Sequence, residues 1–108
     1  MGNGKNKAES RGHYKLEAWK LSMELVRNVY RLTQPFPKEE MFGLTSQMRR
    51  AAASIPSNIA EARGSLSELE TQLLIAVDLG YIKKDDHVFH LLDRVSRLIT
   101  GLHKTVRS

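Results

Sequence analysis

The feature that most constrains this chain is the spacing of its apolar residues between positions 86 and 107. They recur every three or four positions, which places them on one face of an α-helix. One helix cannot bury this face alone, because ordering its residues costs about 33 kcal/mol and burying the stripe returns roughly 12–24 kcal/mol. Partner helices must therefore cover the residues of the stripe: Val88, Leu91, Leu92, Val95, Leu98, Ile99, Leu102 and Val106.

Helical spacing also covers three earlier segments, so we predict helices over residues 14–33, 44–62 and 66–79. None of them shows the strict alternation that is typical of a half-buried strand. The connections between the helices are short. The predicted fold is therefore all-α, an up-and-down four-helix bundle formed by residues 14–108. Residues 1–13 are rich in Gly, Asn and Lys, and we expect them to form a flexible basic tail.

The first predicted helix has a wide apolar surface. Its main stripe is widened by Leu25, Val29 and Leu32, and we expect the stripe to face the core. Trp19 and Tyr30 are accordingly interpreted as core residues. Further along the chain, Gly80 suits the position just past a helix end, and Asp85 or Asp86 suits the cap of the last helix. The main stripe consists of Leu16, Trp19, Met23, Val26 and Tyr30.

Pro56 interrupts the second predicted helix. It lacks an N–H group and crowds the carbonyl of Ala52, which costs a regular helix about 3 kcal/mol. One interpretation is a structural kink, in which the hydroxyls of Ser54 and Ser57 satisfy the freed carbonyl. The other is that the kink presents Ser57 and Asn58 to a partner subunit or a ligand.

The composition narrows the chemistry. The chain has no cysteine, so it forms no disulfide and offers no thiolate nucleophile or thiolate metal ligand. Its longest apolar runs are far shorter than the 20 or so residues that span a membrane. A cytoplasmic location without membrane contact is therefore expected. The formal net charge is +5, with both ends of the chain basic and the middle mildly acidic, which makes a nucleic-acid partner plausible.

Two groups of titratable residues are candidate sites. His87 and His90 have helical spacing, but no Glu-x-x-His pair accompanies them, and we interpret them as surface histidines. Glu61 and Glu70 lie close to the apolar faces of the second and third predicted helices. We interpret them as partners in inter-helix salt bridges or as polar residues at the edge of those faces, and not as a pair for acid–base catalysis. No nucleophile-elbow, phosphate-loop or zinc-protease motif is present. We therefore expect no enzyme activity, no metal and no cofactor.

The basic residues are the remaining functional signal. If the first and last helices are adjacent, their polar sides form one positive surface that binds phosphates without reading sequence. The hypothesis is that this surface binds structured RNA or duplex DNA. The alternative is a protein scaffold that ignores nucleic acid. The candidate nucleic-acid-binding residues are Lys15, Lys20, Arg27, Arg31, Arg94, Arg97, Lys104 and Arg107.

Three stretches carry a family resemblance. They are YKLEAWKLSMELVRNVYRLT, FPKEEMFGLTSQMRRAAASIPSNIAEA and RGSLSELETQLLIAVDLGYI, and together with the last helix they extend over about residues 14–104. They resemble the 23S rRNA intervening-sequence proteins, a bacterial family of four-helix bundles whose biochemical role is unsettled. The resemblance implies a homopentamer. It also implies a fold similar to a nucleic-acid-binding accessory protein of diversity-generating retroelements, although fold alone does not establish function.

The chain departs from this pattern in one place. Relatives usually carry an additional stretch between the second and third motifs, whereas here Glu61 runs directly into Ala62. Either the third helix is short, or a segment is missing near Glu61 and Ala62. A short third helix is locally feasible, because Gly64 suits a helix end and Ser65 with Glu68 forms a Ser-x-x-Glu capping box.

Overall fold

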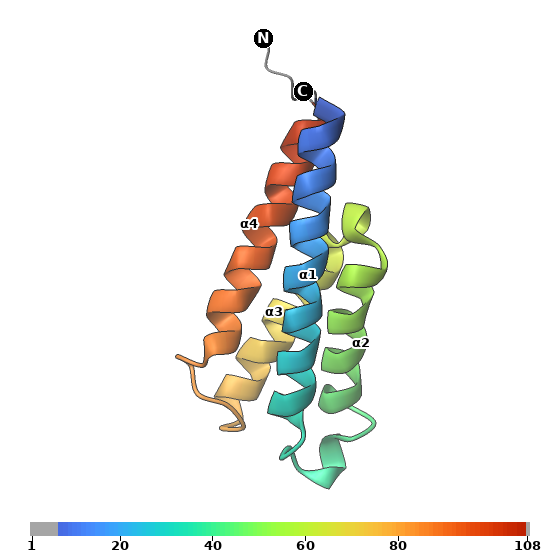
Figure 1. The fold of residues 1–108 in the computed structure, drawn as a ribbon. Coiled ribbons are helices and arrows are strands. Elements are labelled where there is room, and N and C mark those ends of the chain that lie inside the picture. Colours follow the sequence, from blue (N-terminus) through green and yellow to red (C-terminus); the bar gives the residue numbers. More distant parts are fainter. Residues whose placement is uncertain (1–6, 108) are drawn as a thin grey trace.

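The computed structural model describes residues 7–107, with the side chains of residues 12–102. Four helices form a bundle, which confirms the predicted all-α class and four-helix architecture (Figure 1). Two single-turn 3-10 helices, η1 (Lys38–Glu40) and η2 (Ile59–Glu61), lie between them. The four helices are α1 (Lys7–Thr33), α2 (Leu44–Ser57), α3 (Arg63–Asp78) and α4 (His87–Arg107).

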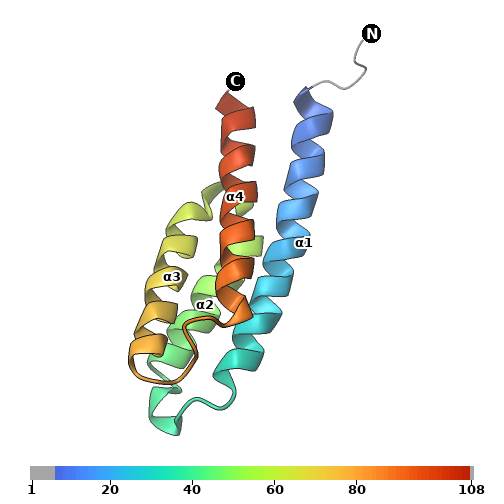
Figure 2. The ribbon, with the colours of Figure 1, turned by 90° about the vertical axis from the view of Figure 1, so that its left-hand side faces the viewer.

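The helices pack as a closed ring of neighbours. α1 contacts both α4 and α2, and α3 contacts α2 and α4. α1 and α4 are longer than the other two helices, so together they extend beyond the α2–α3 pair at one end of the bundle (Figure 2). Within the described residues, no helix is both long enough and apolar enough to cross a membrane.

One apolar core runs through the bundle, and all four helices contribute fully buried side chains to it. The stripe predicted on α4 is confirmed as a core face, because five of its members are at most 5 % exposed. The largest fully buried apolar residues are Leu25, Val29, Met48, Ile55, Leu69, Leu73, Leu91, Val88, Val95 and Ile99.

The end of α3 and the start of α4 form as their local sequence predicts. Gly80 has a φ of +80°, a left-handed conformation that residues with a Cβ adopt only under strain. The N–H of Gly80 donates to the Val77 carbonyl at 3.0 Å and that of Tyr81 to the Ala76 carbonyl at 2.9 Å, which together form a Schellman motif closing α3. At the start of α4, Asp86 Oδ1 accepts the N–H of Val88 at 2.9 Å. Of the two candidate caps, Asp86 is the one that acts.

The buried face of α1 differs from the prediction. The core side is formed by Ala18, Ser22, Leu25 and Val29, and all four are 0 % exposed. Leu25 and Val29 were expected to face the core, but three members of the main stripe lie at the surface, with Leu16 51 %, Trp19 46 % and Tyr30 44 % exposed, whereas Val26 is partly buried against the core. Both sets of residues have helical spacing on neighbouring sides of the helix, so the packing of α2 and α4 decides between them. The interpretation of Trp19 and Tyr30 as core residues was therefore wrong.

The connection between α2 and α3 also differs. α2 was expected to reach residue 62, but it ends at Ser57, and α3 begins at Arg63, three residues earlier than predicted. Gly64 lies in the first turn of α3 and not just past the C-terminal end of the preceding helix. The capping box does not form, because no side chain caps α3, and the Ser65 hydroxyl hydrogen-bonds the hydroxyl of Ser54.

The third helix is short, as one of the two alternatives expected: α3 has 16 residues, against 27 in α1 and 21 in α4. The other alternative, a missing segment near Glu61 and Ala62, predicts an intact mass above the 12.3 kDa of this sequence. At the start of the chain, residues 1–6 of the expected tail lie outside the described residues. Residues 7–13 extend α1, so the helix begins seven residues earlier than predicted.

Candidate nucleic-acid interface

The basic residues predicted on the first and last helices lie on neighbouring elements. α1 and α4 pack side by side, as the hypothesis of one joint surface requires (Figures 1 and 2). Every candidate whose side chain is described is exposed, in keeping with the high cost of burying an unpaired charge. These are Lys15, Lys20, Arg27 and Arg31 on α1 and Arg94 and Arg97 on α4. Lys104 and Arg107 belong to α4, but their side chains lie outside the described set.

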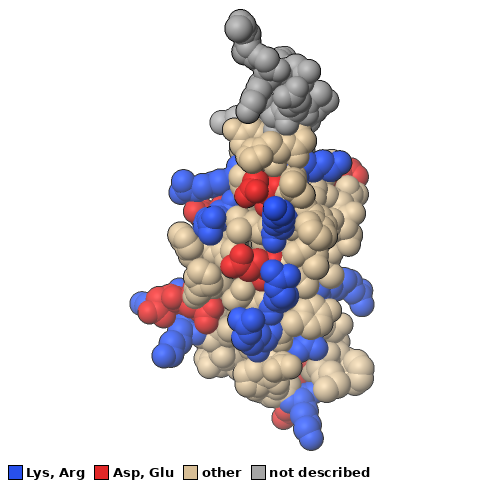
Figure 3. Space-filling model, viewed as in Figure 1, with Lys and Arg blue, Asp and Glu red and all other residues tan. Residues whose placement is uncertain are grey.

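Carboxylates partly offset the positive charge of this face. Glu17 and Glu24 stand among the basic residues of α1. On α4, Arg97 Nε lies 2.9 Å from Asp93 Oδ2 in an exposed ion pair one helical turn apart. Figure 3 shows the outcome over α1 and α4, where basic and acidic side chains alternate instead of forming a uniform basic patch. The face therefore carries mixed charge, with its cations separated by carboxylates.

Pro56 lies in the last turn of α2, so the regular helix ends one residue after it. Only Ser57 of α2 follows the proline, and the single-turn helix η2 begins two residues later at Ile59. The Ser54 hydroxyl donates to the Ala51 carbonyl and the Ser57 hydroxyl to the Ala53 carbonyl, both at 2.7 Å. The two hydroxyls thus bind carbonyls on either side of the one that Pro56 frees.

A shallow pocket brings two groups of candidate residues together. Lys15, Leu16 and Trp19 of α1 line it with residues 56–60, which include all three kink or interface candidates: Pro56, Ser57 and Asn58. Asn58 is held in place, since its backbone N–H donates to the carbonyls of Ser54 and Ile55 at 3.2 and 3.3 Å. The pocket joins one cation and one exposed indole to the end of α2.

A second pocket between α1 and the start of α2 was not expected from the sequence. It is lined by three aromatic rings, three cations and several hydroxyl and amide groups. Phe42, in the turn before α2, is 93 % exposed. The available signal was an apolar Met-Phe pair in a turn, ahead of two consecutive arginines. The lining residues are Tyr30, Thr33, Gln34, Phe36, Pro37, Lys38, Met41, Phe42, Thr45, Ser46, Arg49 and Arg50.

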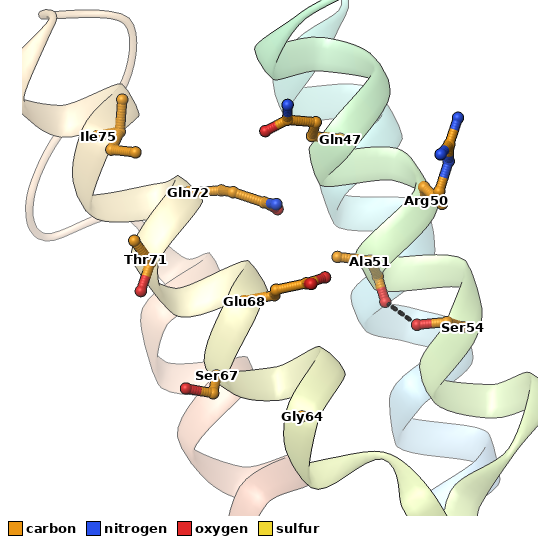
Figure 4. Close-up of a pocket in the computed structure, with 10 residues that line it drawn as sticks. All are labelled: Gln47, Arg50, Ala51, Ser54, Gly64, Ser67, Glu68, Thr71, Gln72 and Ile75. Carbon is orange, nitrogen blue, oxygen red and sulfur yellow. Dashed lines mark hydrogen bonds between the residues drawn. The ribbon is translucent and has the colours of Figure 1, made fainter.

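A groove between α2 and α3 is lined mainly by polar residues, and Glu68 is the one carboxylate among them. In Figure 4, Glu68 and Gln72 extend from α3 toward α2, whereas Arg50 points away from them. Gln72 Oε1 is buried and has no hydrogen-bond partner among the described residues.

The other titratable candidates do not converge. The rings of His87 and His90 lie 5.9 Å apart, and among the described side chains no cluster of three or more His, Asp or Glu residues can hold a metal ion. Glu61 and Glu70 are both exposed. They make no ion pair within the described region, and Glu61 Oε1 instead lies 3.4 Å from the Asn58 side-chain amide.

One tyrosine has a perturbed pKa. The Tyr81 hydroxyl donates a 2.9 Å hydrogen bond to Glu40 Oε2, which links the end of α3 to η1. This bond stabilises the neutral phenol, and with partial burial and the negative charge of Glu40 it raises the pKa of Tyr81 above the ordinary 10.0. The contact is structural, because it fastens the two connections at one end of the bundle.

Residues 14–64 match the family model described as 23S rRNA-intervening sequence protein. The family resemblance is thereby confirmed over residues 14–64, which hold the first two of the three resembling stretches. The matched segment contains residues 14–33 of α1, the whole of α2 and every residue of the second pocket, and it ends at Gly64, just past the Glu61–Ala62 junction. No curated protein matches the chain.

Proposed function

We propose that this 23S rRNA-intervening-sequence-type protein is a non-enzymatic helical bundle that binds structured RNA or duplex DNA through the α1–α4 face. The observation that carries the proposal is the adjacency of α1 and α4, whose described basic candidates are all exposed. Lys and Arg in such an arrangement contact phosphates and release counterions, which provides affinity without base recognition. The description of the family, which refers to ribosomal RNA, is consistent with this role.

Charge reversal tests the proposal. The variant Lys20→Glu, Arg27→Glu, Arg31→Glu changes three exposed residues on the outer side of α1 and leaves the core intact. We expect it to lose at least tenfold in affinity for a structured RNA at low salt, because each lost phosphate contact removes part of the electrostatic attraction. Fluorescence anisotropy with a labelled ribosomal RNA fragment measures this loss.

A matched control has the same change in net charge elsewhere. Arg63, Lys83 and Lys84 are exposed on α3 and in the connection to α4. Reversing these three residues is expected to weaken binding far less than reversing the α1 set. Equal losses in both variants would show that only net charge matters, and would contradict a binding face on α1 and α4.

The protein is further proposed to act as a cytoplasmic homo-oligomer, a pentamer by family resemblance. The exposed stripe on α1 supports self-association, because Leu16, Trp19 and Tyr30 place large apolar surfaces in water along one side of the helix. Sedimentation equilibrium of the wild type and of a Leu16→Ser, Trp19→Ser variant tests this. A monomeric wild type would contradict it.

The same stripe favours the alternative function, a protein scaffold with no nucleic-acid binding. An exposed apolar face of this kind suits a partner protein as well as a second copy. A wild type that binds neither RNA nor DNA at low salt, while its α1 stripe is protected from acrylamide quenching by a partner protein, would favour the scaffold.

A further inference from the structure

The pocket between α1 and the start of α2 has a composition that suits one class of ligand. Its cations are Lys38, Arg49 and Arg50, and no Asp or Glu is among its lining residues. Glu39 and Glu40 follow Lys38 in the chain but do not line the pocket, and Glu40 is directed to Tyr81, whose hydroxyl donates to its Oε2 at 2.9 Å. The pocket is therefore positive, in contrast to the mixed charges of the α1–α4 face.

Arg49 is held in a defined position. Its Nε donates to Thr33 Oγ1 at 2.9 Å, and its Nη2 lies 3.4 Å from the Tyr30 carbonyl oxygen. Thr33 is itself fixed, because its hydroxyl donates to the Val29 carbonyl at 2.8 Å. These contacts place the guanidinium over the Tyr30 ring, 4.7 Å from its centroid. A planar cation on an aromatic ring, prepared before any ligand arrives, is a surface on which a nucleobase stacks.

Phe42 supplies a second aromatic surface. Phe42 is 93 % exposed, which is unusual for a large apolar side chain, and it is not among the residues that pack against the core. Met41 beside it is 54 % exposed. The volume of the pocket, about 590 Å³, lies in the ordinary range for sites that take a small organic group. Stacking surfaces together with unpaired cations distinguish single-stranded nucleic-acid sites from plain anion sites.

We propose that this pocket binds one unpaired nucleotide of an RNA. The base stacks on the Phe42 ring or on the Arg49–Tyr30 pair, and Lys38 and Arg50 contact the phosphates. Thr45, Ser46 and Gln34 line the same pocket and supply polar groups for the base edge or the ribose. The inference rests on the proposed nucleic-acid binding, and it extends it from charge alone to a preference for loops and bulges over continuous duplex.

The test compares three labelled RNAs. The first is a hairpin, the second a blunt duplex with the stem sequence of the hairpin, and the third a short oligoadenylate. Phe42→Ala is the decisive variant, because Phe42 is almost fully exposed and its removal leaves the core unchanged. Stacking of one base contributes enough that we expect a loss of about tenfold for the hairpin and the oligoadenylate. Duplex affinity should not change.

Two controls sharpen the comparison. Phe42→Trp keeps a stacking ring and is expected to retain hairpin affinity. Leu74→Ala removes an exposed apolar side chain on α3, outside the pocket, and is expected to have no effect on any of the three RNAs.

The outcomes separate this inference from the proposed function. If Phe42→Ala binds the hairpin and the oligoadenylate as tightly as the wild type does, the inference is wrong, and the Phe42 turn is assigned to protein contact. If those two affinities are unchanged while the α1 charge reversal abolishes duplex binding, the proposed function stands alone. If the oligoadenylate binds in a Phe42-dependent way and neither the hairpin nor the duplex binds, nucleotide binding in the pocket is supported and nucleic-acid binding by the α1–α4 face is contradicted.

Discussion

Two leucines of α1 distinguish the observed packing from the packing expected from the apolar pattern. Leu25 is 0 % exposed and Leu16 is 51 % exposed, although the pattern placed Leu16 in the main stripe and Leu25 at its margin. Leu25→Ala and Leu16→Ala remove the same atoms from the same helix. Their effects on stability therefore report which side of α1 faces the core.

The magnitudes follow from burial. Leu→Ala at a fully buried site costs about 2–5 kcal/mol, because the lost transfer free energy adds to the free-energy cost of the cavity left behind. At Leu16 about half of the side chain is already in water and no enclosed cavity forms. Removing its methine and two methyl groups, at about 0.8 kcal/mol for each when fully buried, should cost about 1 kcal/mol.

Urea unfolding followed by circular dichroism measures both changes, with the m-value as a check that the transition stays comparable. Self-association makes the free energy of unfolding depend on protein concentration. Each variant is therefore measured over a dilution series, and the free energies extrapolated to low concentration are compared. Equal losses, or a larger loss for Leu16→Ala, would refute the observed orientation of α1.

Four further substitutions have defined outcomes. Gly80→Ala forces a Cβ into a left-handed conformation and is expected to lower the free energy of unfolding by about 1–2 kcal/mol, whereas Gly101→Ala, inside α4 with open space for a Cβ, should raise it by roughly 0.5–1 kcal/mol; chemical denaturation compares the two. Asp86→Ala removes the cap of α4 and should cost about 1 kcal/mol in the same assay, and no loss would show that the cap is idle. Because the pKa of Tyr81 is raised in the folded protein, its contact stabilises the fold below pH 10.0 and this contribution is lost as the pH rises through the folded-state pKa. An ultraviolet tyrosinate titration of Glu40→Gln should show that pKa falling toward its ordinary value, and an unchanged titration would exclude the contact.

Most of the fold is predictable because it depends on local patterns. The stripe of α4 has little apolar competition on its other sides, so spacing alone identifies its buried face. Gly80 and Asp86 act through contacts within a few residues, and such contacts are visible in a short stretch of sequence. The end of α2 was harder to predict, because the pattern carries apolar residues past Pro56 to Ile59 and Ala62, and both are buried although regular helix has ended.

The site was only partly predictable, for a related reason. That Lys20 and Arg27 are exposed follows from their charge and helical position. The packing of Arg49 on Tyr30 and Thr33 joins residues 16 to 19 positions apart, and it depends on how α1 and α2 lie against each other. No pattern within one helix contains that information. The pocket around Phe42 is a property of the packed bundle.

Binding of RNA as a function of salt tests the central claim most directly. A labelled structured ribosomal RNA fragment and a matched DNA duplex are titrated with the wild-type protein across a salt series. The account predicts binding at low salt that weakens steeply, with a slope of log K against log salt of about −3 or steeper if four or more phosphates are contacted. It further predicts a preference for the RNA with unpaired nucleotides. Absence of binding to either nucleic acid at low salt would contradict the account.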